Sequence, residues 1–288
     1  MSTGMEEDEE VWLEGKVALV TGASSGLGRM FSLALAAHGC HVVIAARRVQ
    51  LLHSLLQHIN SFSTSTDSCE QQQQRRRAGK AAIVELDVSS GEASVDACVE
   101  NAWNAFGKID ILVNNAGFRG TVKSSLELEE DEWNKVMATN IRGVWLVAKS
   151  VGKRMKAAKQ GGSIINISSI AAVERSLLPG ASAYASSKAA VNLLTKMMAL
   201  ELGQYNIRVN ALAAGLFRSE ITSTLMEKEW MDRVAKKIVP LRRWGNTDPD
   251  LTSLILLLAS DSSSYITGNI FIVDGGQSLT GIPIWSSL

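Results

Sequence analysis

The sequence predicts a single doubly wound α/β domain built on a seven-stranded parallel sheet. Short runs rich in Val and Ile alternate with longer amphipathic segments along most of the 288 residues. Such apolar runs are typical of strands that are buried on both faces. Strands that alternate with helices imply right-handed crossovers, with helices covering both faces of the sheet. The length fits one domain with a large core, because single α/β domains often run to roughly 200–250 residues.

The expected strands are the short apolar runs at residues 16–20, 41–45, 81–86, 109–113, 163–167, 207–212 and 269–273. The expected helices are the longer amphipathic segments at residues 27–38, 49–60, 92–106, 131–158 and 181–202. Shorter helical pieces are expected within residues 220–238 and 249–259.

Two segments depart from this alternation. Residues 1–14 are acidic, which favours disorder. Residues 61–79 are polar and low in complexity, which favours a surface-loop insertion. The run Arg75-Arg76-Arg77 inside this insertion could bind an anionic partner, but no second feature supports that reading. We expect one domain over residues 15–276, which includes a substrate lid at residues 216–244. Residues 277–288 are expected to form a C-terminal tail.

Composition excludes several classes of protein. Lys and Arg total 29, and so do Asp and Glu, so charge gives no reason to expect nucleic acid or an anionic membrane as a partner. The three cysteines are widely spaced and favour a reducing compartment over disulfides or a metal site. The acidic start fits neither a secretory signal nor a transit peptide, and no apolar run reaches the roughly 20 residues that span a bilayer. We expect a cytoplasmic protein.

A glycine-rich turn joins the first expected strand to the first expected helix, with the sequence Thr21-Gly22-Ala23-Ser24-Ser25-Gly26-Leu27-Gly28. Gly22 permits a tight turn, Gly26 lets the backbone approach a pyrophosphate, and Gly28 lets the helix pack near the strand. The helix N-terminus adds free N–H groups and a positive dipole end. A purely structural turn is the alternative, but this position is the context of a dinucleotide site. The predicted contacts are Gly22, Ser24, Ser25, Gly26, Leu27 and Gly28.

The end of the second expected strand indicates which dinucleotide is bound. NAD enzymes usually place an acid there to accept hydrogen bonds from the ribose hydroxyls, whereas this chain has Ala45-Ala46-Arg47-Arg48. A guanidinium matches the 2′-phosphate of NADP in charge and in geometry. We predict NADP(H) as the cofactor, with Arg47 as the main contact and Arg48 beside it. Solvated side chains at the start of the next helix are the alternative.

Tyr184 and Lys188 are four residues apart, so they share one face of the expected helix over residues 181–202. An arbitrary pair of this kind is usually a surface packing pair. Here the preceding strand runs toward Ser168 and Ser169, of which only one can reach a substrate because adjacent strand residues point to opposite faces. Ligands of parallel sheets bind beyond the carboxyl ends of the strands. The pair, the serines and the glycine turn should therefore face one crevice.

Taken in order, these motifs resemble the short-chain dehydrogenase/reductase family, and most nearly its 3-oxoacyl-[acyl-carrier-protein] reductase-like members. The resemblance runs from residue 13 to residue 276 and rests on TGASSGLG, Asp87, Asn114-Asn115-Ala116-Gly117, Asn140, Ser169, YASSK at 184–188 and DGG at 274–276. It implies a Rossmann-type fold and a catalytic tetrad of Asn140, Ser169, Tyr184 and Lys188. The cofactor contacts that it implies are Asp87, Val88, Asn114, Ala116, Gly117, Tyr184, Lys188, Gly215 and Leu216.

The chemistry gives each member of the tetrad a task. Hydride transfer to a carbonyl leaves negative charge on oxygen, which needs a proton. A free tyrosine has a pKa of about 10, so we expect the ammonium of Lys188 and the oxidised nicotinamide to lower the pKa of Tyr184. Ser169 would polarise the substrate oxygen, and Lys188 would hold the nicotinamide ribose. By resemblance Asn140 anchors a water in a proton relay; a buried backbone-bonding role is the alternative.

The substrate side is less defined. The family usually has Pro before Gly215, whereas this chain has Ala214, which should loosen the cofactor loop slightly. Residues 118–127 are expected to form one wall of the substrate site and the lid another. The apolar lid side chains suit a hydrophobic substrate or simply pack the lid to the core; they are Phe217, Leu225, Met226, Trp230, Met231, Ile238 and Trp244.

We therefore expect a reductase of a small-molecule carbonyl compound, either 3-oxoacyl-like or lipophilic. The alternative is a catalytically silent NADP-binding scaffold, against which the intact tetrad argues. By resemblance the helices over 131–158 and 181–202 join subunits in a homotetramer or homodimer. Small side chains on the second helix would allow close approach there, namely Ala183, Ala185, Ser186, Ala189 and Ala190.

Overall fold

The computed structural model describes residues 13–62, 78–173, 177, 179–218, 222, 227 and 229–279. Several predictions fall partly outside the described residues: those for the acidic N-terminal segment, the polar insertion with Arg75, Arg76 and Arg77, the C-terminal tail, and Glu220, Leu225 and Met226 of the lid. The proposed domain boundaries therefore stay predictions.

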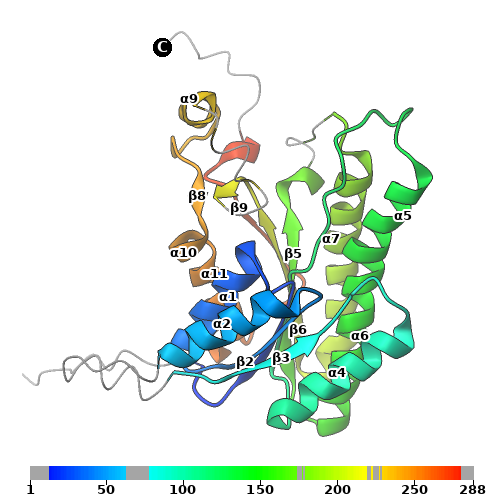
Figure 1. Ribbon diagram of the computed structural model, residues 1–288, viewed down its shortest axis with the longest axis vertical. Helices are drawn as coiled ribbons and strands as arrows, with labels where there is room; N and C mark the ends of the chain where they lie inside the picture. The colour runs from blue at the N-terminus through cyan, green and yellow to red at the C-terminus, as the bar shows by residue number, and fades with distance from the viewer. Residues whose placement is uncertain are drawn as a thin grey trace, which may run out of the picture.

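A seven-stranded parallel sheet forms the centre of the molecule, in the order β3-β2-β1-β4-β5-β6-β9 (Figure 1). Its strands are β1 (Val17–Thr21), β2 (His41–Ala46), β3 (Ala81–Glu85), β4 (Ile111–Asn114), β5 (Gly162–Ser169), β6 (Ile207–Ala214) and β9 (Ile270–Val273). The predicted fold class is confirmed. Because the chain winds outward from β1 in one direction and from β4 in the other, the switch point lies between these two strands.

Helices cover both faces of the sheet (Figure 1). One side carries α1 (Gly26–Ala37), α2 (Val49–Ser61) and α11 (Thr252–Ala259). The other carries α4 (Glu92–Phe106), α6 (Val144–Ala158) and α7 (Ser182–Leu202). Among the described residues, the other α-helices are α5 (Glu130–Met137), α9 (Trp230–Ile238) and α10 (Thr247–Asp250).

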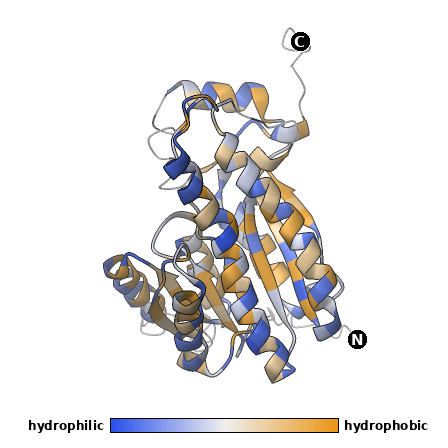
Figure 2. Cartoon of the chain, turned by 90° about the vertical axis from the view of Figure 1, so that its right-hand side faces the viewer, coloured by the Kyte–Doolittle hydropathy of each residue, from blue (hydrophilic) through white to orange (hydrophobic). Residues whose placement is uncertain are grey.

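The alternation of side chains along each strand divides the core in two. In β1, Ala18 and Val20 belong to the cluster under α1, α2 and α11, whereas Val17 and Leu19 belong to the cluster under α4, α6 and α7. Figure 2 shows the strands as mostly hydrophobic, between helices that carry hydrophilic residues as well. Burial on both faces explains why the strands read as continuous apolar runs. No helix in the described part of the chain is long and apolar enough to span a membrane.

One continuous α-helix was predicted over residues 131–158, but its helical geometry changes part-way along. A six-residue π-helical segment, Ala138–Gly143, separates α5 from α6. Such segments place extra residues in a turn and often occur at functional sites. A Cβ on Gly143 would lie 2.6 Å from the carbonyl oxygen of Val88. Glycine at this position therefore lets the segment pack directly on the chain after β3.

Two strands run two residues past their predicted ends. β5 and β6 were expected to end at residues 167 and 212, but Ser168 pairs with Ala213 and Ser169 with Ala214. The two serines are thus held in the sheet instead of a loop. A second, two-stranded sheet that the sequence did not predict joins β7 (Phe217–Arg218) to β8 (Gly245–Asn246) and ties the start of the lid segment to its end.

Candidate active site

The glycine turn leads from β1 into α1 at the switch point of the sheet. Gly22 has φ of +65°, and a Cβ there would lie 2.8 Å from the Cα of Ala116. A Cβ on Gly28 would lie 2.5 Å from the carbonyl oxygen of Gly22. Gly26 has φ of +54° and open space beside it, at the first residue of α1. Gly22 and Gly28 are therefore needed for packing, while Gly26 keeps the helix N-terminus accessible to a phosphate.

Thr21 and Asn115 clamp this turn to the end of β4. The Thr21 hydroxyl accepts hydrogen bonds from the backbone N–H of Asn115 and of Ala116, each at 3.1 Å. The Asn115 side chain donates to the carbonyls of Thr21 at 2.9 Å and Gly22 at 3.2 Å. Neither residue was assigned a role from the sequence, although Thr21 lies in the motif TGASSGLG and Asn115 in NNAG.

The side chain of Asn114 is buried inside the fold. It is 2% exposed and donates to Asn166 Oδ1 at 3.0 Å and to the carbonyl of Val144 at 3.3 Å. Asn166 in turn donates to Thr195 of α7 at 3.0 Å. The Asn114 side chain thus holds β4 to β5 and α6, and its contact with the cofactor stays a prediction.

The two arginines after β2 lie in different surroundings. Arg48 donates to the Ser24 hydroxyl at 3.2 Å and to the Ser25 hydroxyl at 2.6 Å, so it lies against the glycine turn. Arg47 is exposed, and its guanidinium lies 3.9 Å from the carboxylate of Asp87. Apart from Asp87, no acidic partner is recorded for Arg47 in the described part of the chain. Arg47 is thus exposed and only loosely paired, whereas Arg48 is hydrogen-bonded to the glycine turn.

Asp87 and Val88 follow β3 next to these arginines. The Asp87 carboxylate accepts from the backbone N–H of Ser89 at 2.9 Å and from its hydroxyl at 2.7 Å. Burial would raise the pKa of Asp87, but the hydrogen bonds from Ser89 and the charge of Arg47 outweigh it and lower the pKa. Asp87 therefore stays ionised at neutral pH. Val88 is buried against Gly143.

Tyr184 lies in the first turn of α7, facing the end of β5. The Ser169 hydroxyl lies close enough to its phenol to lower the pKa of Tyr184 against the effect of burial. The Ser168 hydroxyl points to the other side and donates to the carbonyl of Lys188 at 3.3 Å. Of the two serines, Ser169 is therefore the one placed beside the phenol, as the alternation of strand residues requires.

Lys188 lies one turn further along α7 and is 4% exposed. Its Nζ donates to the carbonyl of Ile167 at 2.8 Å and lies 5.8 Å from the centre of the Tyr184 ring. Burial lowers the pKa of Lys188 to about 8, because a low-dielectric environment disfavours the charged form. The amine therefore carries its proton less firmly than a surface lysine does.

The predicted lowering of the Tyr184 pKa by Lys188 is wrong for the chain by itself. Burial raises the pKa of the phenol, and this outweighs the opposing effects of the Ser169 hydrogen bond and the Arg119 charge. The physical reason is desolvation, which penalises a phenolate more than the nearby charges stabilise it. The contribution expected from an oxidised nicotinamide stays a prediction.

Asn140 lies in the π-helical segment and is completely buried. Its side chain accepts from the backbone N–H of Phe118 at 2.7 Å and donates to the carbonyl of Phe118 at 2.8 Å. It also donates to the Ser187 hydroxyl at 3.0 Å. These contacts match the backbone-bonding alternative, and the water-anchoring role stays a prediction. A Cβ on Gly117 would lie 3.6 Å from both Asn140 Oδ1 and Lys188 Nζ, so Gly117 lies between them.

Gly215 and Leu216 follow β6 at the same edge of the sheet. A Cβ on Gly215 would lie 2.7 Å from the Cβ of Asp274, so only glycine fits against the DGG turn. Leu216 packs on a small cluster formed by Met231, Ala235, Val239 and Trp244. Ala214 is the last residue of β6 and pairs with Ser169 and Val273. Sheet pairing thus fixes the position where the family pattern has proline.

A family model described as enoyl-(acyl carrier protein) reductase matches residues 22–278. The chain belongs to the short-chain dehydrogenase/reductase family. The resemblance drawn from the motifs is thereby confirmed, and with it the class of oxidoreductases.

Relatives in this family cover nearly the whole chain. Trans-4-hydroxycyclohexanecarboxylate dehydrogenase of Sinomonas cyclohexanicum is 39% identical over 265 residues, which are 91% of this chain and 92% of that protein. 3-oxoacyl-[acyl-carrier-protein] reductase FabG of Thermotoga maritima is 35% identical over 264 residues, which are 92% and 98% of the two chains. The crystal structure of a gluconate 5-dehydrogenase from Burkholderia cenocepacia, in complex with NADP and tartrate, matches with a TM-score of 0.82 and 31% identity, covering 94% of this chain and 98% of that one.

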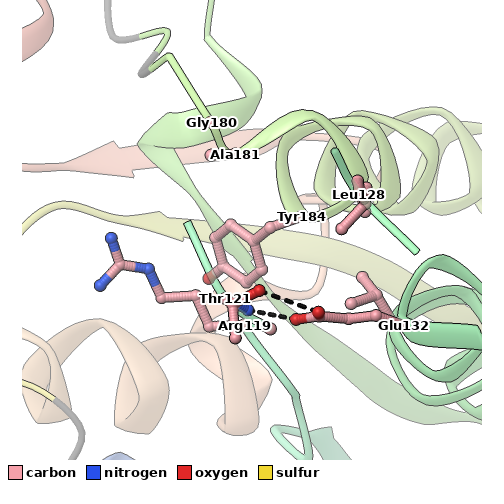
Figure 3. A pocket seen from close by; sticks show the side chains of 10 residues that line it. Arg119, Thr121, Leu128, Glu132, Gly180, Ala181 and Tyr184 are labelled. Atoms are coloured by element: carbon pink, nitrogen blue, oxygen red, sulfur yellow. Dashed lines mark hydrogen bonds between the residues drawn. The ribbon is translucent and has the colours of Figure 1, made fainter. Parts of the chain in front are cut away.

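The substrate side of this short-chain dehydrogenase/reductase contains a small pocket beside Tyr184 (Figure 3). Arg119, Gly120 and Thr121 line this pocket, and so does Glu132 of α5. The expectation that residues 118–127 form one wall of the substrate site stays a prediction. Glu132 accepts hydrogen bonds from the backbone N–H of Thr121 and, at 2.8 Å, from its hydroxyl. Neither Arg119 nor Glu132 was predicted from the sequence, because no general motif marks either position.

The lid supports the packing alternative for most of its described apolar residues. Met231 and Trp244 are 3% and 4% exposed and pack together with Ile238, and Phe217 is buried in the main core. Trp230 is exposed. A hydrophobic substrate is therefore not required to explain these side chains. No group of three or more His, Cys, Asp or Glu among the described residues is arranged to hold a metal ion.

Proposed function

We propose that the chain is an NADP(H)-dependent oxidoreductase that transfers a hydride between nicotinamide and a carbonyl or secondary alcohol, and that it works as a ketone reductase. The observation that carries this proposal is the position of Tyr184 beside Ser169 at the carboxyl edge of the sheet, with Lys188 one turn away on α7. The glycine turn lies on the same edge, at the switch point of the sheet.

The residues around the switch point fit a dinucleotide phosphate. Open space beside Gly26 leaves the N-terminus of α1 accessible, and an anion is stabilised there by free N–H groups and the helix dipole. Arg47 and Arg48 would hold the additional phosphate of NADP, because β2 ends in Ala46 and offers no acid to a ribose. When bound, the reduced cofactor supplies the hydride. The crystal structure of the gluconate 5-dehydrogenase relative contains NADP, which supports this choice.

Residues of the chain would supply the proton that the substrate oxygen needs after hydride transfer. Because burial raises the pKa of Tyr184, the phenol keeps its proton at neutral pH and can donate it to a substrate oxygen. Ser169 would donate a second hydrogen bond to that oxygen and stabilise the charge that develops on it. Lys188, whose pKa is lowered to about 8 by burial, can exchange a proton close to physiological pH. These properties favour reduction over oxidation at neutral pH.

The substrate is a small carbonyl compound, but the relatives point to different kinds. One is named as a reductase of 3-oxoacyl thioesters and others as dehydrogenases of hydroxy acids. Our expectation of a 3-oxoacyl-like or lipophilic substrate stays a proposal, and the packing of the lid removes part of its support.

The test is the loss of NADPH absorbance with a panel of diketones, 3-oxoacyl thioesters, oxo acids and aldehydes. Turnover of at least one class, abolished in Tyr184→Phe, is the expected result. NADPH binding without turnover of any class would favour the alternative, a catalytically silent NADP-binding scaffold.

We also propose a homotetramer or homodimer joined through α5, α6 and α7. Apolar side chains on these helices are exposed in the single chain, namely Trp133, Trp145, Leu193, Met197 and Leu200. Covering such side chains favours association. Sedimentation that shows only monomer at micromolar concentration would contradict this assembly. The cytoplasmic location also remains a proposal, to be checked by imaging a fluorescent fusion.

A further inference from the structure

The pocket beside Tyr184 contains a cation that the proposed chemistry does not use. Arg119 is exposed and lines this pocket together with the phenol. Its positive charge acts on the Tyr184 phenol through space. Within the described part of the chain, no ion pair or hydrogen bond is recorded for its guanidinium. The guanidinium of Arg119 therefore has five N–H donors that no residue of the described chain engages.

The acid that could neutralise Arg119 is already engaged. Both oxygens of the Glu132 carboxylate accept hydrogen bonds from Thr121. These hydrogen bonds, first the one from the backbone N–H, lower the pKa of Glu132. In Figure 3 the guanidinium of Arg119 extends away from Glu132, whereas dashed lines join Glu132 to Thr121. Glu132 thus fixes the wall and leaves the charge of Arg119 to a ligand.

We infer that Arg119 binds a carboxylate of the substrate, so that the substrates of this enzyme are oxo acids and the corresponding hydroxy acids. This inference rests on the proposed function and names its substrate class. A guanidinium pairs with a carboxylate through two parallel hydrogen bonds, which orient the bound molecule as well as hold it. Such a pair would turn the carbonyl of the same molecule toward Tyr184 and Ser169.

The position of Arg119 favours a carboxylate over a distant phosphate. Arg119 and Tyr184 line one small pocket, so the anion must lie only a few bonds from the reacting carbonyl. The phosphate of a carrier-bound 3-oxoacyl thioester is separated from its carbonyl by a long pantetheine arm. A short oxo acid carries its charge at the right separation, whereas a neutral ketone would offer Arg119 no ion pair.

The test compares acids with their uncharged esters. Levulinate and cyclohexanone carboxylate, each with its methyl ester, are reduced with NADPH by the wild type, Arg119→Gln and Arg119→Lys. We expect the wild type to prefer each acid, and Arg119→Gln to lower the acid-to-ester ratio of kcat/KM about ten- to hundredfold, as for a hydrogen bond to a charged group. Arg119→Lys should restore part of the ratio that Arg119→Gln loses, because lysine keeps the positive charge but cannot form the two parallel hydrogen bonds of a guanidinium.

Lys135→Gln is the matched control, since it removes the same charge from the neighbouring helix α5 without lining the pocket. Its acid-to-ester ratio should equal that of the wild type. A ratio that Arg119→Gln leaves unchanged, or that Lys135→Gln lowers equally, would overturn the inference. Using a ratio cancels any general effect of Arg119 on Tyr184.

A binding measurement separates this inference from the proposed function. Tartrate is titrated into the NADPH-loaded protein by calorimetry, in the wild type and in Arg119→Gln. Binding that Arg119→Gln abolishes supports the carboxylate site even if no ketone is turned over, in which case only the proposed function fails. Equal binding in both proteins, or none in the wild type together with no preference for acids, overturns the site.

Discussion

The cofactor side and the substrate side of this site are built by different means. On the cofactor side, backbone groups and the lack of a Cβ do most of the work: Thr21 and Asn115 lock the turn, and Gly22 and Gly28 fit where no other residue can. On the substrate side, single side chains such as Glu132 and Arg119 form the wall. Backbone geometry suits a cofactor shared by a whole family, whereas side chains can change with the substrate.

The largest effect is expected where the two sides meet, at Tyr184. Tyr184→Phe removes the proton donor while keeping the ring in its buried position, so kcat should fall about a hundred- to ten-thousandfold. The dissociation constant for NADPH, measured by fluorescence, should change little. Tyr205→Phe makes the same chemical change where the ring stacks with Lys156, and it should keep wild-type activity. Substantial turnover by Tyr184→Phe would remove the phenol from the mechanism.

The two arginines offer a way to sharpen the description of the cofactor side. Arg47 is exposed and loosely paired, so Arg47→Ala should raise the KM for NADPH about ten- to hundredfold, the value of a charged hydrogen bond, and leave the KM for NADH unchanged. Arg48 also donates to the glycine turn, so Arg48→Ala should raise the KM for both cofactors. Equal preference for NADPH and NADH in both the wild type and Arg47→Ala would contradict the NADP(H) assignment.

On the substrate side, the link between Glu132 and Thr121 can be cut without touching the cofactor. Glu132→Gln weakens two exposed hydrogen bonds, so the KM for the substrate should rise about two- to fivefold while the KM for NADPH stays constant. Glu130→Gln removes a neighbouring charge on the same helix and should change neither. A parallel rise in both Michaelis constants would mean that the two sides are mechanically coupled.

The same division explains which features the sequence could predict. The seven strands follow from two-sided burial, and the glycine turn and the Tyr184–Lys188 pair follow from spacing and order. The π-helical segment could not be predicted, because it depends on how Asn140 bonds Phe118 and how Gly143 meets Val88. The direction of the Tyr184 pKa shift could not be predicted either, since the burial that raises this pKa is a property of the folded chain.

Arg119 and Glu132 illustrate the limit most clearly. Nothing in their spacing distinguishes them from the other charged residues between 119 and 135. They become recognisable only when the fold brings the segment after β4 beside α7. Contacts that depend on a long-range approach of this kind carry no local signal in the sequence.

The smallest expected effect concerns the stability cost of placing Lys188 in the core. Its pKa falls from 10.5 to about 8 on burial. Below pH 8 the amine is charged in both the folded and the unfolded chain, so the full cost of burying the charge is present. Between the two values the folded chain loses its proton first, and stability therefore rises with pH. Lys188→Met keeps the packed side chain without the charge, and it should have the higher Tm at neutral pH.

The difference in Tm between Lys188→Met and the wild type should thus be a few degrees at neutral pH, on the scale expected for about 1 kcal/mol, and should shrink as the pH rises above 8. Lys196→Met, on an exposed position of the same helix, should give a difference that does not depend on pH. If the difference in Tm between Lys188→Met and the wild type stays constant or grows with pH, burial does not destabilise the charged form of Lys188. In that case the hydrogen bond to Ile167 would have to stabilise the ammonium enough to offset its burial. Lys188 would then keep its proton near neutral pH and serve mainly as a structural group, like the residues that fix the glycine turn.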